Sequence, residues 1–133
     1  MAELFDKLNL GDRRDILILN APPEFETELR KLSGVKIRRD AAEAATIGFA
    51  IAFAVTSAER DAASAALTAR AAADAILWIA YPKASSKRYA CEFNRDSGWD
   101  VMRSAGFDSV RMVAIDADWS ALRFRRAERI RRG

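Results

Sequence analysis

The chain has 133 residues, of which 50% are hydrophobic and 31% are charged, and its formal net charge at pH 7 is +3. This composition argues against a disordered chain, and the length suits one domain that buries its own core. The sequence has no histidine, which excludes histidine metal ligands and every serine–histidine or cysteine–histidine nucleophile pair, and its one cysteine, Cys91, excludes an internal disulfide.

The first ten residues predict a short amphipathic helix, because Leu4, Phe5 and Leu8 share one helical face. This segment has neither the basic start nor the apolar run of a signal peptide. The longest apolar stretch, residues 44–55, is well short of the ~20 residues that span a bilayer. We therefore expect a cytoplasmic protein without a membrane partner.

Strands are predicted by the apolar patterns that follow. Three continuous apolar runs indicate strands buried on both faces, as in a parallel sheet: residues 15–20, 49–55 and 75–81. A short alternating segment, 35–38, is typical of an edge strand. Two further strands, 109–115 and 121–127, are joined by a turn so short that they must pair antiparallel.

Helices are expected between these strands, at residues 22–33, 56–72 and 97–105, with a short helix or turn at 40–46. Thr56 and Glu59 match a capping box at the start of the alanine-rich second helix. A basic, polar loop follows at 83–94.

This element order predicts an α/β fold: one three-layer, Rossmann-like domain over residues 1–133. Its sheet should be mostly parallel, with about six strands and an antiparallel edge strand from the C-terminal hairpin. The predicted strand order, numbered along the chain, is 2-1-3-4-6-5. A helix at 1–10 and a basic tail at 128–133 flank the core.

The element order over about residues 15–127 resembles the core of class I S-adenosylmethionine-dependent methyltransferases. The turn Ala105-Gly106-Phe107, followed by a strand and then Leu122-Arg123-Phe124, is similar to the way such domains end. More closely, the chain resembles a family of short bacterial proteins classed as a domain of unknown function. The matching segments are LWIAYPK at 77–83, RDSGW at 95–99 and AIDADWSALRF at 114–124. The resemblance implies a truncated methyltransferase-like core, one strand–helix unit short.

Two departures from that resemblance bear on the cofactor. Methyltransferases of this class place a glycine-rich loop after the first strand, whereas residues 20–23 read NAPP, with no glycine and two prolines. They also place an acidic residue at the end of the second strand, where this chain has Arg38 and Arg39, with Asp40 next to them. We therefore predict no firmly bound cofactor, with S-adenosylmethionine as the alternative.

A ligand site is expected outside the carboxyl ends of the strands, where open α/β sheets bind their ligands. The loops that reach this edge contain the candidate ligand-binding residues Asn20, Thr56, Ser57, Lys83, Ser85, Ser86, Trp99, Asp116 and Trp119. One interpretation is an anion pocket of Lys83, Lys87 and serine hydroxyls beside helix N-termini. The alternative is structural: solvated loops, a helix cap at Thr56, a turn aspartate at Asp116 and tryptophans that pack loops together.

Nucleophile chemistry has little support. Lys83 could activate Ser85 or Ser86 only if it were buried, and a lone cysteine such as Cys91 is more often inert. We predict no catalytic residue and no metal site.

The C-terminal segment concentrates the positive charge. Residues 123–133 hold six arginines and one glutamate, a charge of +5, which leaves about −2 for the rest of the +3 chain. On a strand, Arg123 and Arg125 would share one face, while Phe124 and Arg126 would share the other. The candidate nucleic-acid-binding residues are Arg125, Arg126, Arg129, Arg131 and Arg132. The alternative is a solvated tail, or one that pairs with a partner.

The expected function is a non-catalytic, degenerate methyltransferase-like module that binds an anionic small molecule or a partner protein. A divergent S-adenosylmethionine-dependent methyltransferase is the first alternative. A nucleic-acid-binding protein that acts through its arginine-rich tail is the second.

Overall fold

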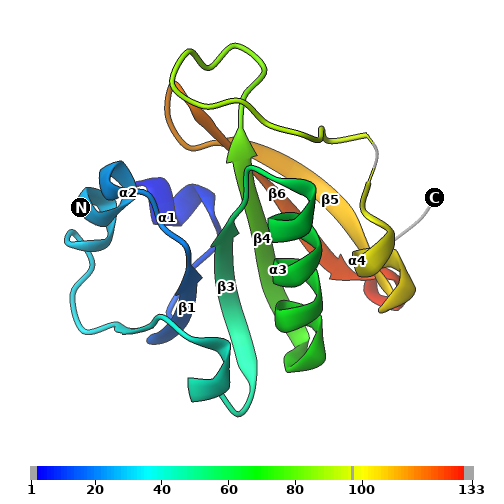
Figure 1. Cartoon of the computed structure of the whole chain (residues 1–133). Coiled ribbons are helices and arrows are strands. Elements are labelled where there is room, and N and C mark those ends of the chain that lie inside the picture. The colour runs from blue at the N-terminus through cyan, green and yellow to red at the C-terminus, as the bar shows by residue number, and fades with distance from the viewer. Residues whose placement is uncertain (1–2, 97, 131–133) are drawn as a thin grey trace.

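A computed structural model describes residues 3–96 and 98–130 and shows a twisted sheet with helices on both faces (Figure 1). The strands are β1 (Asp15–Leu19), β2 (Lys36–Arg38), β3 (Ile47–Phe53), β4 (Ala71–Pro82), β5 (Phe107–Ala114) and β6 (Trp119–Arg126). The helices are α1 (Glu3–Lys7), α2 (Pro23–Leu29), α3 (Ser57–Ala69) and α4 (Asp100–Ser104), with 3-10 turns η1 (Ala41–Glu43) and η2 (Ala127–Arg129). In this part of the chain, no helix has both the length and the apolar character needed to cross a membrane.

The strand order is β2-β1-β3-β4-β6-β5, which confirms both the predicted order and the α/β class. The neighbouring strands β2, β1, β3 and β4 pair in parallel. The antiparallel strand is β6, which pairs with β4 on one side and β5 on the other, so the edge strand β5 runs in the same direction as β4.

Strand β3 shows why the two faces of the sheet receive different helices. Its alternating residues Ala50 and Ala52 face α3 and α4, and the small side chains let α3 pack closely against the sheet. The residues between them, Phe49, Ile51 and Phe53, face α1 and α2, where they fill a wider gap with aromatic and branched side chains. All five are at most 2% exposed, so β3 forms the centre of both cores.

Helix α1 is fixed to the sheet through Trp78 of β4. The indole N–H of Trp78 donates to the carbonyl of Leu8 over 2.9 Å, and both Phe5 and Leu8 are buried. The predicted amphipathic helix is therefore confirmed, although it ends at Lys7. The chain then turns at Asn9, which has a positive φ of 66°.

The predicted end of the second long helix is wrong. Alanine favours a helix through residue 72, but α3 ends at Ala69 and β4 begins at Ala71. Ala71 is the ladder partner of Ile47, whose N–H donates to the carbonyl of Arg70 over 2.7 Å. Pairing with β3 thus overrides the helix propensity of the alanine run.

A bulge interrupts the last ladder. The pairing of β5 with β6 shifts between Ser109 and Arg111, so Val110 is an extra residue. Beyond the bulge, Arg111 lies opposite Arg123. Val110 is 38% exposed, which leaves this apolar side chain partly in solvent on the edge strand.

Candidate functional site

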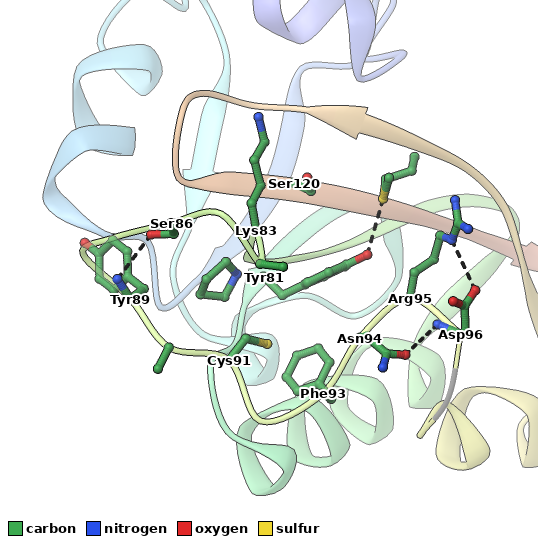
Figure 2. Close-up of a pocket in the computed structure, with 14 residues that line it drawn as sticks. Tyr81, Lys83, Ser86, Tyr89, Cys91, Phe93, Asn94, Arg95, Asp96 and Ser120 are labelled. Atoms are coloured by element: carbon green, nitrogen blue, oxygen red, sulfur yellow. Dashed lines mark hydrogen bonds and ion pairs between the residues drawn. The ribbon is translucent and has the colours of Figure 1, made fainter.

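A cavity of about 720 Å³ lies at the carboxyl end of β4, beneath the long connection to α4 (Figure 2). Its walls are Tyr81 at the end of β4, the connecting segment 83–96, Met112 of β5 and Ser120 of β6. We call it the β4-end cavity. It lies at the edge of the sheet where the sequence predicts a ligand site, and that site stays a prediction.

Tyr81 forms the floor of the β4-end cavity. Its side chain is 6% exposed, and its phenol O–H donates to the sulfur of Met112 over 3.3 Å. Burial raises the pKa of Tyr81 above its ordinary value, which keeps the phenol neutral. The cavity therefore has an aromatic and thioether floor without charge.

Phe93 forms the wall next to Tyr81, and the two rings pack together at 5.5 Å between centroids. Behind it stands Trp99, whose ring meets Phe93 edge-on at 5.5 Å. The Trp99 indole N–H lies 3.1 Å and 3.0 Å from the backbone carbonyls of Asn94 and Arg95. Because Trp99 is only 2% exposed, it holds the wall in place and offers no free face to a ligand.

Several polar residues at the rim of the cavity bind side chains of this chain. The Ser86 hydroxyl donates to Asp118 over 2.9 Å, and Arg95 lies 3.3 Å from the carboxylate of Asp96. Lys83 forms no ion pair with any carboxylate that the structure describes, and Figure 2 shows its side chain extending away from Phe93. Ser85 is exposed and does not line the cavity.

The N-terminus of α3 is occupied by the chain's own carboxylates. Thr56 accepts from the backbone N–H of Glu59, and the Glu59 carboxylate accepts from those of Val55 and Thr56, which confirms the capping box. The carboxylate of Glu92 accepts from the Ser57 N–H over 2.9 Å. The Ser57 and Glu59 N–H groups, which an anion at this helix would use, are therefore already bonded.

Trp119 and Asp116 have structural contacts on the other face of the sheet. Trp119 is 3% exposed and donates its indole N–H to Glu24 over 3.0 Å, and the phenol of Tyr89 donates to the same carboxylate over 2.9 Å. Burial opposes ionisation of Glu24, but these hydrogen bonds, its own backbone N–H and Arg88 lower its pKa overall. Asp116 accepts from two backbone N–H groups of its own turn.

The loop after β1 begins at Asn20, an exposed residue whose φ is +59°. Pro22 and Pro23 follow, and the carbonyl of Pro22 accepts from the N–H of Phe25 at the start of α2. A second cavity, of about 520 Å³, lies between this loop, the end of β2 and α3, with Asn20 and Asp40 among its lining residues.

The residues at the end of β2 are engaged in internal pairs. Arg38 holds Asp15 through two hydrogen bonds of 2.7 Å and 2.9 Å, and Arg39 holds Glu26 through two of 2.7 Å and 2.8 Å. The hydrogen bonds from these arginines lower the pKa of both carboxyl groups. The carboxylate of Asp40 accepts from the backbone N–H of Ala42, which caps η1.

Cys91 lines the β4-end cavity and is half-buried. Burial raises the pKa of its thiol, which favours the unreactive protonated form. No group of three or more histidine, cysteine, aspartate or glutamate side chains among the described residues has the arrangement of a metal site.

The arginines of the C-terminal segment have different surroundings. Arg126 donates to the carbonyl of Ala71 over 2.9 Å and stacks over the ring of Phe107 at 4.9 Å. Arg129 is exposed on η2, while Arg125 points to the opposite face of β6 from Arg126. Arg131 and Arg132 lie outside the described residues.

Of the predicted ligand-binding residues, Lys83 and Ser86 therefore line the β4-end cavity, and Asn20 lines a smaller one. The sequence analysis missed the apolar wall residues, which are Tyr81, Phe93 and Met112. One signal could have found part of this wall. Cys91 and Phe93 alternate with polar residues inside an otherwise polar loop, a pattern typical of an extended segment that packs one side against a surface.

Comparisons with family models and with curated proteins find no match for this chain. Solved structures do match. The N-methyltransferase NodS from Bradyrhizobium japonicum WM9 is 13% identical, over 93% of this chain and 92% of that one, with a TM-score of 0.58. A TehB-like SAM-dependent methyltransferase from Corynebacterium glutamicum ATCC 13032 is 11% identical, over 94% and 86%, with a TM-score of 0.52.

Magnesium protoporphyrin IX methyltransferase (ChlM) from Synechocystis PCC 6803, with bound SAM, is 14% identical over 92% of this chain and 74% of that one, with a TM-score of 0.56. These likenesses establish the fold: the chain has a Rossmann-like core of the methyltransferase type. The resemblance to methyltransferases is thus confirmed for architecture. Membership of the bacterial family of unknown function stays a prediction.

Proposed function

We propose that this methyltransferase-like module binds a small molecule in the β4-end cavity, without catalysing a reaction. The observation that carries the proposal is the cavity itself, about 720 Å³ in volume and placed where the strands end. Ligand pockets of this kind typically measure about 300–1,000 Å³ and combine apolar walls with a few polar groups.

The wall chemistry indicates the ligand class. Tyr81, Phe93 and Met112 offer aromatic and thioether surfaces that suit a flat, apolar body. Ser120 and Lys83 are at the polar side, where a hydroxyl and an ammonium could meet an acceptor or a negative group. We therefore expect an aromatic ligand that carries one anionic or acceptor group.

The segments that would hold an adenosyl cofactor in the manner of class I methyltransferases fit it poorly. Arg38 and Arg39 stand where the resemblance implies an acidic residue, and both are paired with carboxylates of this chain. Asp40, the nearest substitute, already caps η1. The proline loop at 20–23 supplies no glycine for close approach to a cofactor.

Thermal unfolding with S-adenosylhomocysteine tests this part of the proposal. A ligand at about 100 times its Kd adds about 2.7 kcal/mol, which would raise the unfolding midpoint of a chain this size by several degrees. We expect no change in the midpoint. A clear rise would overturn the proposal and favour the divergent methyltransferase, whose supporting observation is the cavity of about 520 Å³ between β1, β2 and α3.

A matched pair of variants tests the β4-end cavity directly. Met112 and Val110 are the two exposed large hydrophobic residues of β5, and only Met112 lines the cavity. With the anionic aromatic probe 8-anilinonaphthalene-1-sulfonate, we expect Met112→Glu to weaken binding about tenfold, because a carboxylate at the wall repels the sulfonate at a cost of about 1.4 kcal/mol. Val110→Glu should leave binding within twofold. Equal effects of the two variants would contradict the proposal.

A further inference from the structure

Four arginines gather on the face of the sheet that α1 covers, away from the β4-end cavity. Arg111 and Arg123 lie opposite each other in the β5–β6 ladder. Their Nη1 atoms both donate to one oxygen, Asn9 Oδ1, at 3.4 Å and 3.2 Å. Two guanidinium groups therefore converge on a single neutral acceptor, which cannot balance their charge.

Arg13 and Arg125 complete this arginine cluster. Burial, followed by the charges of Arg125, Arg111 and Arg13, lowers the pKa of Arg123 below its ordinary value, so each of these three arginines lies close enough to repel Arg123. None of the four forms an ion pair with a carboxylate in residues 3–96 and 98–130. Asp108 lies opposite Arg125 in the ladder, and its carboxylate is 3.9 Å from Arg103.

Arg123 is the member of the cluster that destabilises the fold most. Its Nε is shielded from solvent and has no hydrogen-bond partner among the described atoms. Arg123 is half-buried, and a guanidinium group in that position without a counter-charge destabilises a fold; here three like charges add to that cost. A multivalent anion bound at these guanidinium groups would supply the missing counter-charge and would relieve both costs. The arrangement is therefore more consistent with a binding site than with a solvated surface.

We infer that the arginine cluster of Arg13, Arg111, Arg123 and Arg125, two of which donate to Asn9, is a binding site for a compact phosphate anion of two or more charges. Guanidinium groups bind phosphate oxygens in pairs through parallel N–H donors, and convergent guanidiniums suit several oxygens held close together. An extended nucleic-acid backbone suits a stripe of cations instead, and single strands also need exposed aromatic rings for stacking. Trp78, the aromatic residue opposite Arg123 in the β4–β6 ladder, is fully buried.

Titration calorimetry of the full chain with inorganic triphosphate, at constant ionic strength, tests the site. We expect saturable binding that weakens at least tenfold in Arg111→Gln and in Arg125→Gln. Arg129→Gln removes the same charge from an exposed arginine of η2 outside the cluster, and it should change the affinity less than twofold.

Unfolding without the anion gives an independent readout. Arg111→Gln removes one of the mutually repelling charges, so its melting midpoint should equal or exceed that of the parent chain, while its response to triphosphate is lost. A variant that lost both stability and binding would mean that Arg111 only supports the fold, and this would overturn the inference.

Three other results would also overturn it: no heat of binding in the parent chain, equal weakening by Arg129→Gln, or tighter binding of a nucleic-acid duplex that depends on Arg129 and not on Arg111. The last result would assign anion binding to the arginines that follow β6, outside the arginine cluster. None of these outcomes bears on the β4-end cavity, so the two proposals are tested independently.

Discussion

Glu24 shows how the fold engages a predicted ligand-binding residue, Trp119, in a structural contact. Its carboxylate accepts from the indole of Trp119 and the phenol of Tyr89, which joins α2, β6 and the long connection. Trp119 was a candidate ligand-binding residue, yet it is buried against Phe53 at 5.2 Å between ring centroids. An indole can contact a ligand or pack in a core, and the residues that surround it in the folded chain determine which of the two it does.

Cys91 allows a test at the scale of one residue, because it is the only cysteine of the chain. Burial raises its pKa above the ordinary value of 9.0, so less thiolate is present at any given pH than in an exposed cysteine. We expect alkylation by iodoacetamide to be slow at pH 8 and still to accelerate with pH above 9. Mass spectrometry of quenched samples would measure the rates.

The urea-unfolded chain is the control for this measurement, since its Cys91 should react with the pH dependence of an exposed thiol. A folded chain that reacts with a midpoint at or below 9.0 would contradict the burial of this thiol. Slower alkylation in the presence of a cavity ligand would additionally report occupancy of the β4-end cavity.

At the scale of elements, the sequence predicted what depends on local pattern. Three continuous apolar runs became β1, β3 and β4, and the capping box of Thr56 and Glu59 formed as expected. The end of α3 was missed because the ladder partner of Ala71 is Ile47, which lies 24 residues earlier in the sequence. Propensity acts on neighbours in the chain, whereas strand pairing acts across the sheet.

The N-terminal cap of α3 gives a prediction for Thr56→Ala. The substitution removes the hydroxyl that accepts from the Glu59 N–H, and the loss should lower the free energy of unfolding by about 1 kcal/mol. Thr46→Ala is the matched control, because Thr46 is exposed and has no capping role. Urea unfolding would measure both, and equal effects would show that the cap contributes nothing beyond the loss of a threonine.

At the scale of the whole molecule, the order of strands could be predicted from the sequence, whereas the set of residues that line the β4-end cavity could not. The order rests on rules for short connections and crossovers, which hold for most α/β sheets. The wall of the β4-end cavity combines Tyr81, Phe93, Met112 and Ser120, from three strands and a loop. Their meeting depends on register and on the path of one irregular segment, and neither has a local sequence signal.

Acid should destabilise the whole molecule. The pKa values of Asp15, Glu24, Glu26 and Glu59 are lowered from 3.8 for the aspartate and 4.5 for the glutamates. A lowered pKa in the folded state means that the unfolded chain binds protons first, so the stabilisation is complete above about pH 5 and is lost as the pH falls further. We expect the melting midpoint to be flat from pH 7 to about 5 and then to fall.

The variant Glu26→Gln checks the origin of this acid effect. It removes one carboxyl group whose pKa is lowered by Arg39, so its midpoint should fall less steeply with acid than that of the parent chain. Glu3→Gln, at an exposed position of α1, should leave the slope unchanged. A parent chain that becomes more stable below pH 4 would contradict the assignment.

The bulge at Val110 sets the strand register on which both proposed sites depend. With it, Arg111 lies opposite Arg123 on one face of the sheet, and Met112 lies opposite Leu122 on the other, next to Tyr81. In a regular ladder Arg111 would pair with Leu122 instead, and the two side chains would exchange faces. A change of one residue in the register of this hairpin would therefore alter both sites together. If a one-codon insertion after Val110 shifted the ladder on the turn side by one position, Arg111 would leave the arginine cluster and Met112 would leave the β4-end cavity in the same step, whereas an insertion absorbed in the bulge or in the turn would spare both.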